Sequence, residues 1–316
     1  MPRLSDRITD CALYFYETED DAREGSEYGG CGFLTHVTSE VRTSAGYVYA
    51  VTNAHVIDDG FTAMRASRKD GGIDTIETVP EAWFSHPDGD DIAVLPLETP
   101  VPTLARVRWW SVPTRMFVTR DLIDAYNIGI GDEAFMVGRL IAHDGRQKNA
   151  AVVRFGNISL MADPLEKLRH KNGEFEGFLV ECRSLSGFSG SPVFVMTSQV
   201  YRGESAQRLT MFQIETEIPQ EAREQAREGA KRNIVGSLTL TNAGPWLLGV
   251  DWGHMPLYRT VERLEKPDVS LRVELNTGIA CIAPAWKIMD ALNVGDLMKQ
   301  RQEGDRRLKE PTEAGE

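Results

Sequence analysis

The chain has 316 residues, of which 41% are hydrophobic and 26% are charged, a composition typical of a soluble globular protein with a sizeable core. Its 35 basic and 47 acidic residues give a formal net charge of -12. A phosphate-binding surface needs clustered Lys and Arg, and no long basic run occurs before an acid-diluted tail, so we expect no nucleic-acid partner.

The N-terminal segment carries charges throughout and has no apolar core, so it is not expected to be a secretory signal. No stretch approaches the roughly 18 apolar residues of a membrane span, and we expect no membrane partner. Four cysteines lie far apart, without metal-ligand spacing: Cys11, Cys31, Cys182 and Cys281. In a chain without a signal they are expected to be reduced and buried, and the protein to be cytoplasmic.

Short apolar, β-branched segments separated by Gly, Asn, Asp and Pro dominate most of the chain. These segments are residues 32–37, 47–52, 92–97, 134–137, 152–155, 178–182, 193–197, 247–252 and 279–283. Their length and composition favour strands over buried helices. Many short strands with turn signals predict an all-β sandwich or barrel.

Helical patterns are few. Residues 219–232 open with proline, place acids early and bases late, but have no apolar face. This pattern favours a solvated helix or a disordered loop over a docking element, and all three interpretations stay open. Residues 284–292 predict a short amphipathic helix, and the charged residues 293–316 predict a disordered tail.

Three segments carry residue types that peptide hydrolysis by a serine requires. VTNAHV ends an apolar strand at His55, DIAVLPL begins a strand at Asp91, and GFSGSPVF holds Ser189 in a glycine-flanked turn. Such chemistry needs a nucleophile, a base, a carboxylate that orients the base, and N–H donors for the oxyanion. Alone, each segment is also explained by a structural histidine, a turn aspartate or a tight turn, and Asp90 is a rival of Asp91.

In this order, the three motifs resemble those of the trypsin/chymotrypsin superfamily of serine peptidases, and are most similar to its bacterial HtrA-like branch. Further segments resemble family strands: GCGFL (30–34), GDEAFMVG (131–138), RFGNIS (154–159), GVDWG (249–253) and TGIACIAP (277–284). The resemblance covers about residues 10–292. Unlike in typical HtrA proteins, we expect no PDZ domain, because few residues follow Ala291 in this sequence.

The resemblance implies an all-β fold of two six-stranded antiparallel barrels with a short C-terminal helix. Residues 1–112 would form the first barrel with His55 and Asp91, and residues 113–292 the second barrel with Ser189 and the specificity pocket. Residues 293–316 would be the tail. An insertion at about residues 201–233 would be an accessory element and a candidate site for a protein partner.

The resemblance also implies roles for single residues. Ser189 would be the nucleophile, His55 the general base and then acid, and Asp91 the carboxylate that orients it. The backbone N–H groups of Gly187 and Ser189 would form the oxyanion hole. The implied function is a serine endopeptidase that hydrolyses protein or peptide substrates through an acyl-enzyme, without a cofactor or metal.

The implied specificity pocket consists of Arg183, Ser184, Asp251, Trp252, Gly253 and Gly278. Arg183 lies six positions before Ser189, and the resemblance to trypsin-like enzymes implies that it would lie at the base of the pocket. A free Arg183 would favour acidic side chains, whereas pairing with Asp251 would neutralise the pocket and favour small or apolar ones. Arg183 pointing to solvent is a third interpretation, and a small or apolar preference is favoured slightly.

Phe188 occupies the position where secreted trypsins have an aspartate that pairs with a freed N-terminus, so no N-terminal processing is expected. Other site classes fit less well: Ser191 replaces the last glycine of a G-x-S-x-G elbow, and no H-E-x-x-H occurs. A catalytically idle protease fold that acts as a binding module, and an esterase using the same triad, remain as alternatives.

Overall fold

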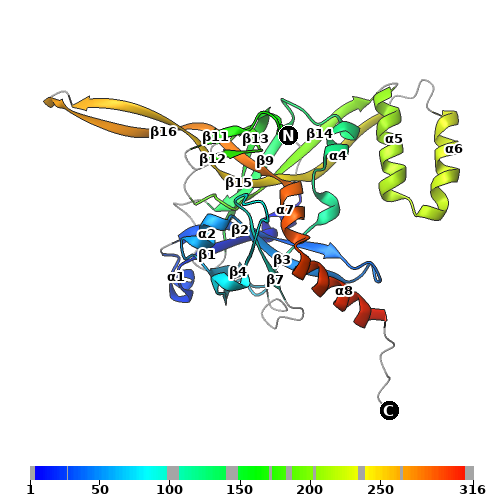
Figure 1. Cartoon of the computed structure of the whole chain (residues 1–316), viewed down its shortest axis with the longest axis horizontal. Helices are drawn as coiled ribbons and strands as arrows, with labels where there is room; N and C mark the ends of the chain where they lie inside the picture. The colour runs from blue at the N-terminus through cyan, green and yellow to red at the C-terminus, as the bar shows by residue number, and fades with distance from the viewer. Residues whose placement is uncertain are drawn as a thin grey trace, which may run out of the picture.

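The computed structural model describes residues 4–26, 28–97, 107–139, 149–170, 173–182, 187–201, 204–233, 239–263 and 266–309. More of these residues are in strands than in helices, and the strands form a sheet in the N-terminal half and a closed barrel in the C-terminal half (Figure 1). Within these ranges, no helix has the length and apolar character needed to cross a membrane.

The N-terminal half forms one sheet of eight strands. In spatial order they are β5 (Ile73–Glu77), β4 (Ala63–Ser67), β1 (Ala12–Tyr16), β2 (Tyr28–Thr38), β3 (Gly46–Thr52), β7 (Ala93–Leu97) and β6 (Phe84–Ser85), with β8 (Val112–Pro113) paired to β2. The described pairings run from β5 to β6 without closing, which differs from the first of the two predicted six-stranded barrels. The edge strand β6 has two residues, so it offers little backbone for a closing ladder.

The C-terminal half forms a closed, six-stranded antiparallel barrel, as predicted. Around the barrel the strands are β10 (Ala151–Leu160), β13 (Phe178–Glu181), β16 (Lys266–Pro284), β15 (Thr239–Arg263), β14 (Pro192–Tyr201) and β9 (Glu133–Arg139). A separate hairpin pairs β11 (Leu168–His170) with β12 (Gly173–Phe175). The predicted apolar segments all fall in strands of the sheet or the barrel, within one residue at each end.

One hydrophobic core is shared between the two halves. Phe33 and Val51 of the sheet lie in the same buried cluster as Phe135 and Phe194 of the barrel. The rings of Phe135 and Phe194 stack with centroids 5.2 Å apart. Because burying apolar surface is the main stabilising contribution to folding, this cluster holds the sheet and the barrel together beside the candidate site.

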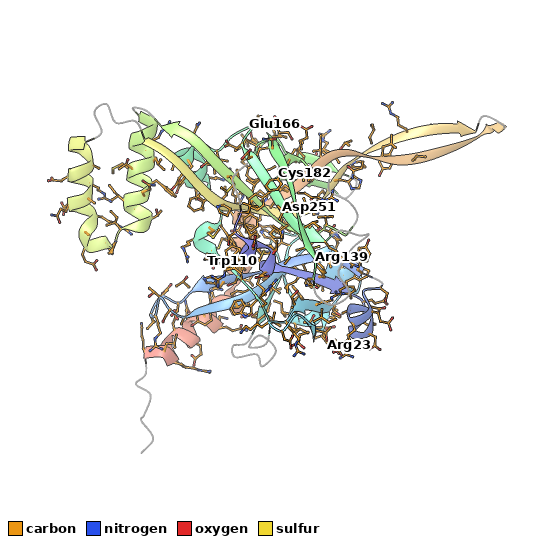
Figure 2. All side chains as sticks on the ribbon, turned by 180° about the vertical axis from the view of Figure 1, so that it is seen from behind. Arg23, Trp110, Arg139, Glu166, Cys182 and Asp251 are labelled. Atoms are coloured by element: carbon orange, nitrogen blue, oxygen red, sulfur yellow. The ribbon has the colours of Figure 1, made fainter. Side chains whose placement is uncertain are left out.

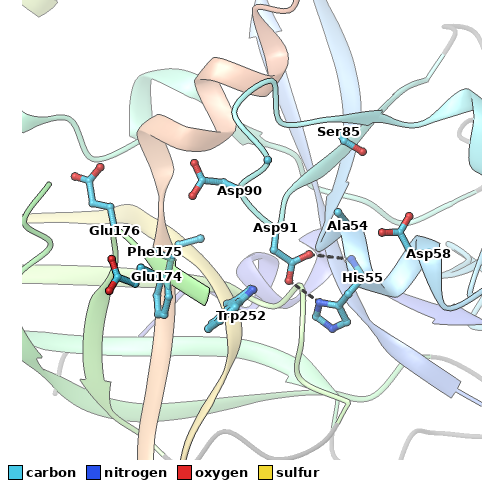
Figure 3. A pocket seen from close by; sticks show the side chains of 12 residues that line it. Ala54, His55, Asp58, Ser85, Asp90, Asp91, Glu174, Phe175, Glu176 and Trp252 are labelled. Atoms are coloured by element: carbon cyan, nitrogen blue, oxygen red, sulfur yellow. Dashed lines mark hydrogen bonds and ion pairs between the residues drawn. The ribbon is translucent and has the colours of Figure 1, made fainter. Parts of the chain in front are cut away.

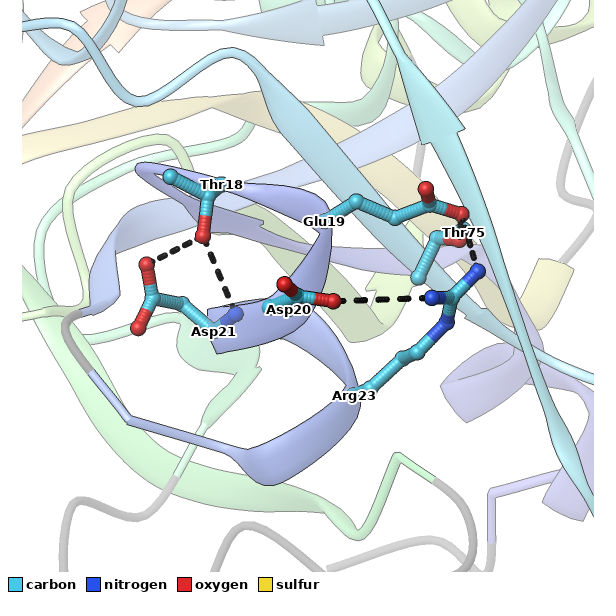
Figure 4. A network of polar contacts seen from close by, with 6 residues as sticks. All are labelled: Thr18, Glu19, Asp20, Asp21, Arg23 and Thr75. Carbon is cyan, nitrogen blue, oxygen red and sulfur yellow. Dashed lines mark hydrogen bonds and ion pairs between the residues drawn. The ribbon is translucent and has the colours of Figure 1, made fainter.

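The short helix α1 (Glu19–Glu24) is fixed to the edge of the sheet by polar contacts (Figure 4). Thr18 caps it, because its Oγ1 accepts a hydrogen bond from the N–H of Asp21 at 3.1 Å. Glu19 accepts hydrogen bonds from Thr75 Oγ1 on β5 at 2.5 Å and from Arg23 Nη2 at 2.6 Å. The cap and the link to β5 together set the helix against the outer strands.

Two arms extend from opposite sides of the barrel (Figure 1). Beyond the barrel, β15 and β16 continue as a two-stranded ribbon, in which Leu257 pairs with Leu275. On the other side, the insertion forms a hairpin of α5 (Glu204–Glu217), a 3₁₀ turn η4 (Gln220–Ala222) and α6 (Arg223–Asn233). Half of the α6 residues whose burial is described are exposed and none is buried, which agrees with the solvated-helix interpretation of residues 219–232. Helix α5, which buries Leu209 and Ile214, was not predicted.

The C-terminal helix α7 (Ala285–Leu292) confirms the amphipathic helix predicted for residues 284–292. The prediction of a disordered tail is wrong for α8 (Gly295–Lys309). In α8 Leu297 is fully buried, and Arg301 Nη1 donates to Tyr49 Oη at 3.0 Å and to the Leu292 carbonyl at 2.6 Å. A helix held largely by hydrogen bonds to the sheet carries little apolar periodicity, so its sequence resembles a solvated tail.

Candidate active site

His55 and Asp91 meet because of the strand order in the sheet. Helix α2 (Ala54–Asp58) follows β3 directly, and Thr52 at the end of β3 pairs with Ala93 at the start of β7. The residues just after β3 and just before β7 therefore lie side by side. The N–H of His55 donates to Asp91 Oδ1 at 2.8 Å, and His55 Nδ1 lies 2.5 Å from Asp91 Oδ2 (Figure 3).

The surroundings of this pair change the pKa of the His55 imidazole. Burial lowers the pKa of His55, but the hydrogen bond and charge of Asp91 outweigh it, and Asp59 and Asp58 add to the rise. The net pKa of His55 is raised above its usual value. Because an ionised carboxylate can only accept, His55 Nδ1 is the donor to Asp91, which leaves Nε2 as the acceptor of a proton.

The neighbouring Asp90 has a different set of contacts. Its carboxylate lies 2.8 Å from Lys287 Nζ on α7 and 3.4 Å from His86 Nδ1. Burial lowers the pKa of Lys287, but hydrogen bonding and charge from Asp90 raise it overall. Of the two acids, Asp91 contacts His55, and Asp90 ties the sheet to the C-terminal helix.

The turn that carries Ser189 is held by its backbone. The N–H of Ser191 donates to the Phe188 carbonyl at 2.8 Å, closing the turn, and the N–H of Cys31 donates to the Ser189 carbonyl at 2.7 Å. The N–H of Gly190 donates to the Asp251 carbonyl on β15 at 2.9 Å. These bonds fix the turn between β2 of the sheet and β15 of the barrel.

The two glycines of this turn are required by its conformation. Gly187 and Gly190 both have a φ of 87°, which side chains rarely tolerate. A Cβ on Gly190 would lie 1.9 Å from the Cys31 carbonyl oxygen. A Cβ on Gly187 would lie 2.4 Å from Cε2 of Tyr28. The sequence pattern around Ser189 therefore encodes both the turn and its close packing on β2.

Three polar groups of the turn are without hydrogen bonds in the part of the chain that the structure describes. They are the Oγ of Ser189 and the N–H groups of Gly187 and Ser189. No hydrogen bond therefore joins Ser189 to His55. Gly30 lies between Val56, the residue after His55, and the Ser189 backbone: a Cβ on Gly30 would lie 2.8 Å from Val56 Cγ2 and 3.0 Å from the Ser189 carbonyl oxygen.

A cleft of about 440 Å³ opens beside the His55–Asp91 pair (Figure 3). Asp58 and Asp90 line it from the sheet, and Phe175 and Trp252 from the barrel side. The rings of Phe175 and Trp252 lie 4.2 Å apart between centroids, inclined at 46°. An aromatic pair next to an acidic rim can contact both apolar and polar parts of a bound chain.

The predicted specificity pocket is described in part. Arg183 and Ser184 lie outside the described residues, so the pairing of Arg183 with Asp251 stays a prediction. Asp251 is fully buried on β15, and Trp252 lines the cleft. Gly253 and Gly278 have positive φ values of 148° and 80°.

Sequence patterns did not identify the residues behind the Ser189 turn. Cys31 Sγ donates to the Gly187 carbonyl at 3.2 Å, and the guanidinium carbon of Arg139 lies 3.8 Å from the centre of the Tyr28 ring. These contacts join residues more than a hundred positions apart, and no local pattern signals them. Phe175, on a short hairpin, was missed for the same reason.

The four cysteines are free thiols and are buried. Burial raises the pKa of Cys31 to about 11, although hydrogen bonding to Ser191 and Arg139 opposes the rise. Across the described ranges, no three His, Cys, Asp or Glu residues come together as ligands for a metal ion.

No model of a known protein family matches the chain, and no curated protein matches it in sequence. The resemblance to the trypsin/chymotrypsin superfamily therefore rests on the motifs themselves and on where their residues lie.

Proposed function

We propose that the chain is a serine endopeptidase of the chymotrypsin type, with Ser189 as nucleophile, His55 as general base and Asp91 as its orienting carboxylate. The observation that carries the proposal is the double hydrogen bond between His55 and Asp91, at 2.8 and 2.5 Å, beside a cleft. A structural histidine would not need its ring and its backbone bound by one carboxylate.

The proposed reaction has two stages, formation of an acyl-enzyme and its hydrolysis, and each begins with nucleophilic attack on a carbonyl carbon. Ser189 Oγ attacks the carbonyl carbon of the scissile peptide bond while its proton passes to His55 Nε2. The oxyanion is received by the N–H groups of Gly187 and Ser189, and the C–N bond breaks as His55 protonates the leaving amine. A water then attacks the acyl-enzyme and gives a proton to His55; the bond between the acyl carbon and Ser189 Oγ breaks, His55 returns the proton to Oγ, and the carboxylic acid product leaves.

The unused donors of the turn support this scheme. Backbone N–H groups in folded proteins nearly always have a partner, so two N–H groups without one among the described residues fit a ligand acceptor at the Ser189 turn. In the proposed chymotrypsin-like architecture, the eight-stranded sheet would take the place of the first barrel. The cleft between the sheet and the barrel would then hold the substrate.

Cleavage of a peptide library, with sequencing of the products, tests the proposal. We expect wild-type protein to cleave peptide bonds and Ser189→Ala to be folded but inactive, because the half-exposed hydroxyl supplies the nucleophile and little packing. Peptidase activity that persists in Ser189→Ala would contradict the assignment. Hydrolysis of simple esters without any peptide cleavage would favour the esterase alternative, and neither activity would favour the binding module.

A further inference from the structure

Tyr28 and Arg139 form a wall behind the loop that carries Gly187. The Tyr28 ring packs against the loop backbone, since a Cβ added to Gly187 would lie 2.4 Å from its Cε2. The guanidinium carbon of Arg139 lies over the face of the same ring, 3.8 Å from its centre. The ring therefore contacts the Gly187 backbone through its Cε2 edge and the guanidinium through its face.

The Arg139 side chain that supports the ring is itself fixed. Arg139, the last residue of β9, is 2% exposed and lies where the barrel meets the N-terminal sheet (Figure 2). Its guanidinium carbon is also 5.2 Å and 5.7 Å from the ring centres of Tyr16 and Tyr14, and its Nη2 donates to the Gly25 carbonyl at 3.3 Å. A buried cation needs such compensation, so its position is tightly determined.

Cys31 adds a polar contact to the same loop. Its Sγ donates to the Gly187 carbonyl at 3.2 Å and accepts from the Arg139 N–H at 3.4 Å. Its own N–H donates to the Ser189 carbonyl at 2.7 Å. The loop between the two candidate oxyanion donors is thus held from behind by β2 and by the end of β9.

We propose that Tyr28 and Arg139 are positioning residues of the oxyanion hole, which fix the Gly187 backbone so that its N–H and that of Ser189 can receive the oxyanion together. The proposal rests on the proposed function and deepens it. The contact between Tyr28 and Arg139 also links the geometry of the hole to the junction between sheet and barrel. An oxyanion forms after attack on the carbonyl and not in the bound substrate, so weakening this support lowers kcat and leaves KM nearly unchanged.

The test compares Tyr28→Leu, which removes the flat ring, with the conservative Tyr28→Phe. We measure kcat and KM on a short peptide amide and the inhibition constant of a matching peptide trifluoromethyl ketone, whose hemiketal oxyanion needs the hole. Loss of a whole oxyanion donor typically costs about 10²–10³ in kcat, so displacement of one in Tyr28→Leu is expected to cost about 10-fold or more. The ketone should bind correspondingly more weakly, while KM stays within about twofold and Tyr28→Phe resembles wild type.

Arg139→Met and Arg65→Met form a second, matched pair. Arg65 is fully buried on β4 and donates to Tyr16 Oη at 3.1 Å and to the Ala22 carbonyl at 3.3 Å. Both changes should reduce the stability of the protein. Only Arg139→Met should in addition lower kcat and weaken the binding of the ketone inhibitor. If Arg139→Met does not fold, the Tyr28 pair decides.

The two proposals fail in different ways. A wild-type protein that neither cleaves peptides nor reacts with a fluorophosphonate contradicts the proposed function. An active wild type, together with a Tyr28→Leu variant that keeps its kcat and its affinity for the ketone, overturns the positioning role. The positioning role would also be overturned if Arg139→Met changed kcat, KM and the affinity for the ketone no more than Arg65→Met does.

Discussion

The two halves of the candidate site are held by different kinds of contact. In the sheet, His55 and Asp91 are joined through their side chains, with the ring nitrogen 2.5 Å from the carboxylate. In the barrel, the Ser189 turn is held by backbone hydrogen bonds to Cys31 and Asp251, and Ser189 Oγ has no partner among the described residues. Substituting side chains should therefore damage the first half locally, whereas the second half should be most sensitive to changes of backbone conformation.

The largest expected effect on kcat comes from breaking the contact between the side chains of His55 and Asp91. Asp91→Asn keeps the size of the side chain but favours the wrong tautomer of His55, so kcat should fall by about 10⁴ with the fold intact. The matched control is Asp90→Asn, which removes the contact with Lys287 and should leave kcat within about tenfold. Steady-state kinetics on one peptide substrate checks both. If Asp90→Asn has the larger effect, the wrong acid has been assigned.

Disturbing the backbone of the Ser189 turn should reduce both stability and activity. Gly190→Ala introduces a Cβ 1.9 Å from the Cys31 carbonyl oxygen at a φ of 87°, so the turn must move. We expect a loss of about 3 kcal/mol or more in the free energy of unfolding, measured by urea denaturation, and little remaining activity.

Gly60→Ala is the control for this change. Gly60 has a φ of 94° but no atom within 4 Å of its added Cβ, so the variant should lose only the conformational term of about 1–2 kcal/mol. Equal losses in the two variants would show that packing on β2 contributes nothing to the Ser189 turn.

The same contrast explains what the sequence could predict. His55 and Asp91 were found because each follows or precedes an apolar strand, and strand pairing then brings them together. The barrel strands carry the same local signal. Helix α8 was not found, because a single buried apolar residue, Leu297, and the hydrogen bonds of Arg301 to Tyr49 and to the Leu292 carbonyl hold it in place, without a continuous apolar face. Tyr28 behind Gly187 was missed because that contact depends on how sheet and barrel meet.

The activity should depend on pH through the titration of His55. A serine peptidase needs His55 neutral, so kcat/KM should fall as the pH drops through the raised pKa of His55. Asp59 and Asp58 help to raise this pKa. Removing either charge, in Asp59→Asn or Asp58→Asn, should therefore move the acid limb of the profile to lower pH. Added salt should shrink the shift because both side chains are exposed. A profile that does not move would mean that another group controls the limb.

The smallest effect on activity is expected from a change in the helical arm, which lies outside the candidate site. Replacing residues 219–232 by a short Gly/Ser linker removes η4 and most of α6, which lie on the arm that extends from the barrel (Figure 1). Cleavage of small peptides should stay within about twofold of wild type, since local changes distant from a site usually act independently of it. Loss of small-peptide cleavage, with an unchanged circular dichroism spectrum, would show that this arm supports the site.

Covalent labelling by a fluorophosphonate tests the central claim most directly, because the reaction needs a serine activated by a neighbouring base. The labelled protein is digested and the modified residue identified by mass spectrometry. The proposed mechanism predicts a single adduct, on Ser189, that forms much more slowly in His55→Ala and not at all in Ser189→Ala. A folded wild-type protein that forms no adduct, or an adduct that persists in Ser189→Ala, would contradict it.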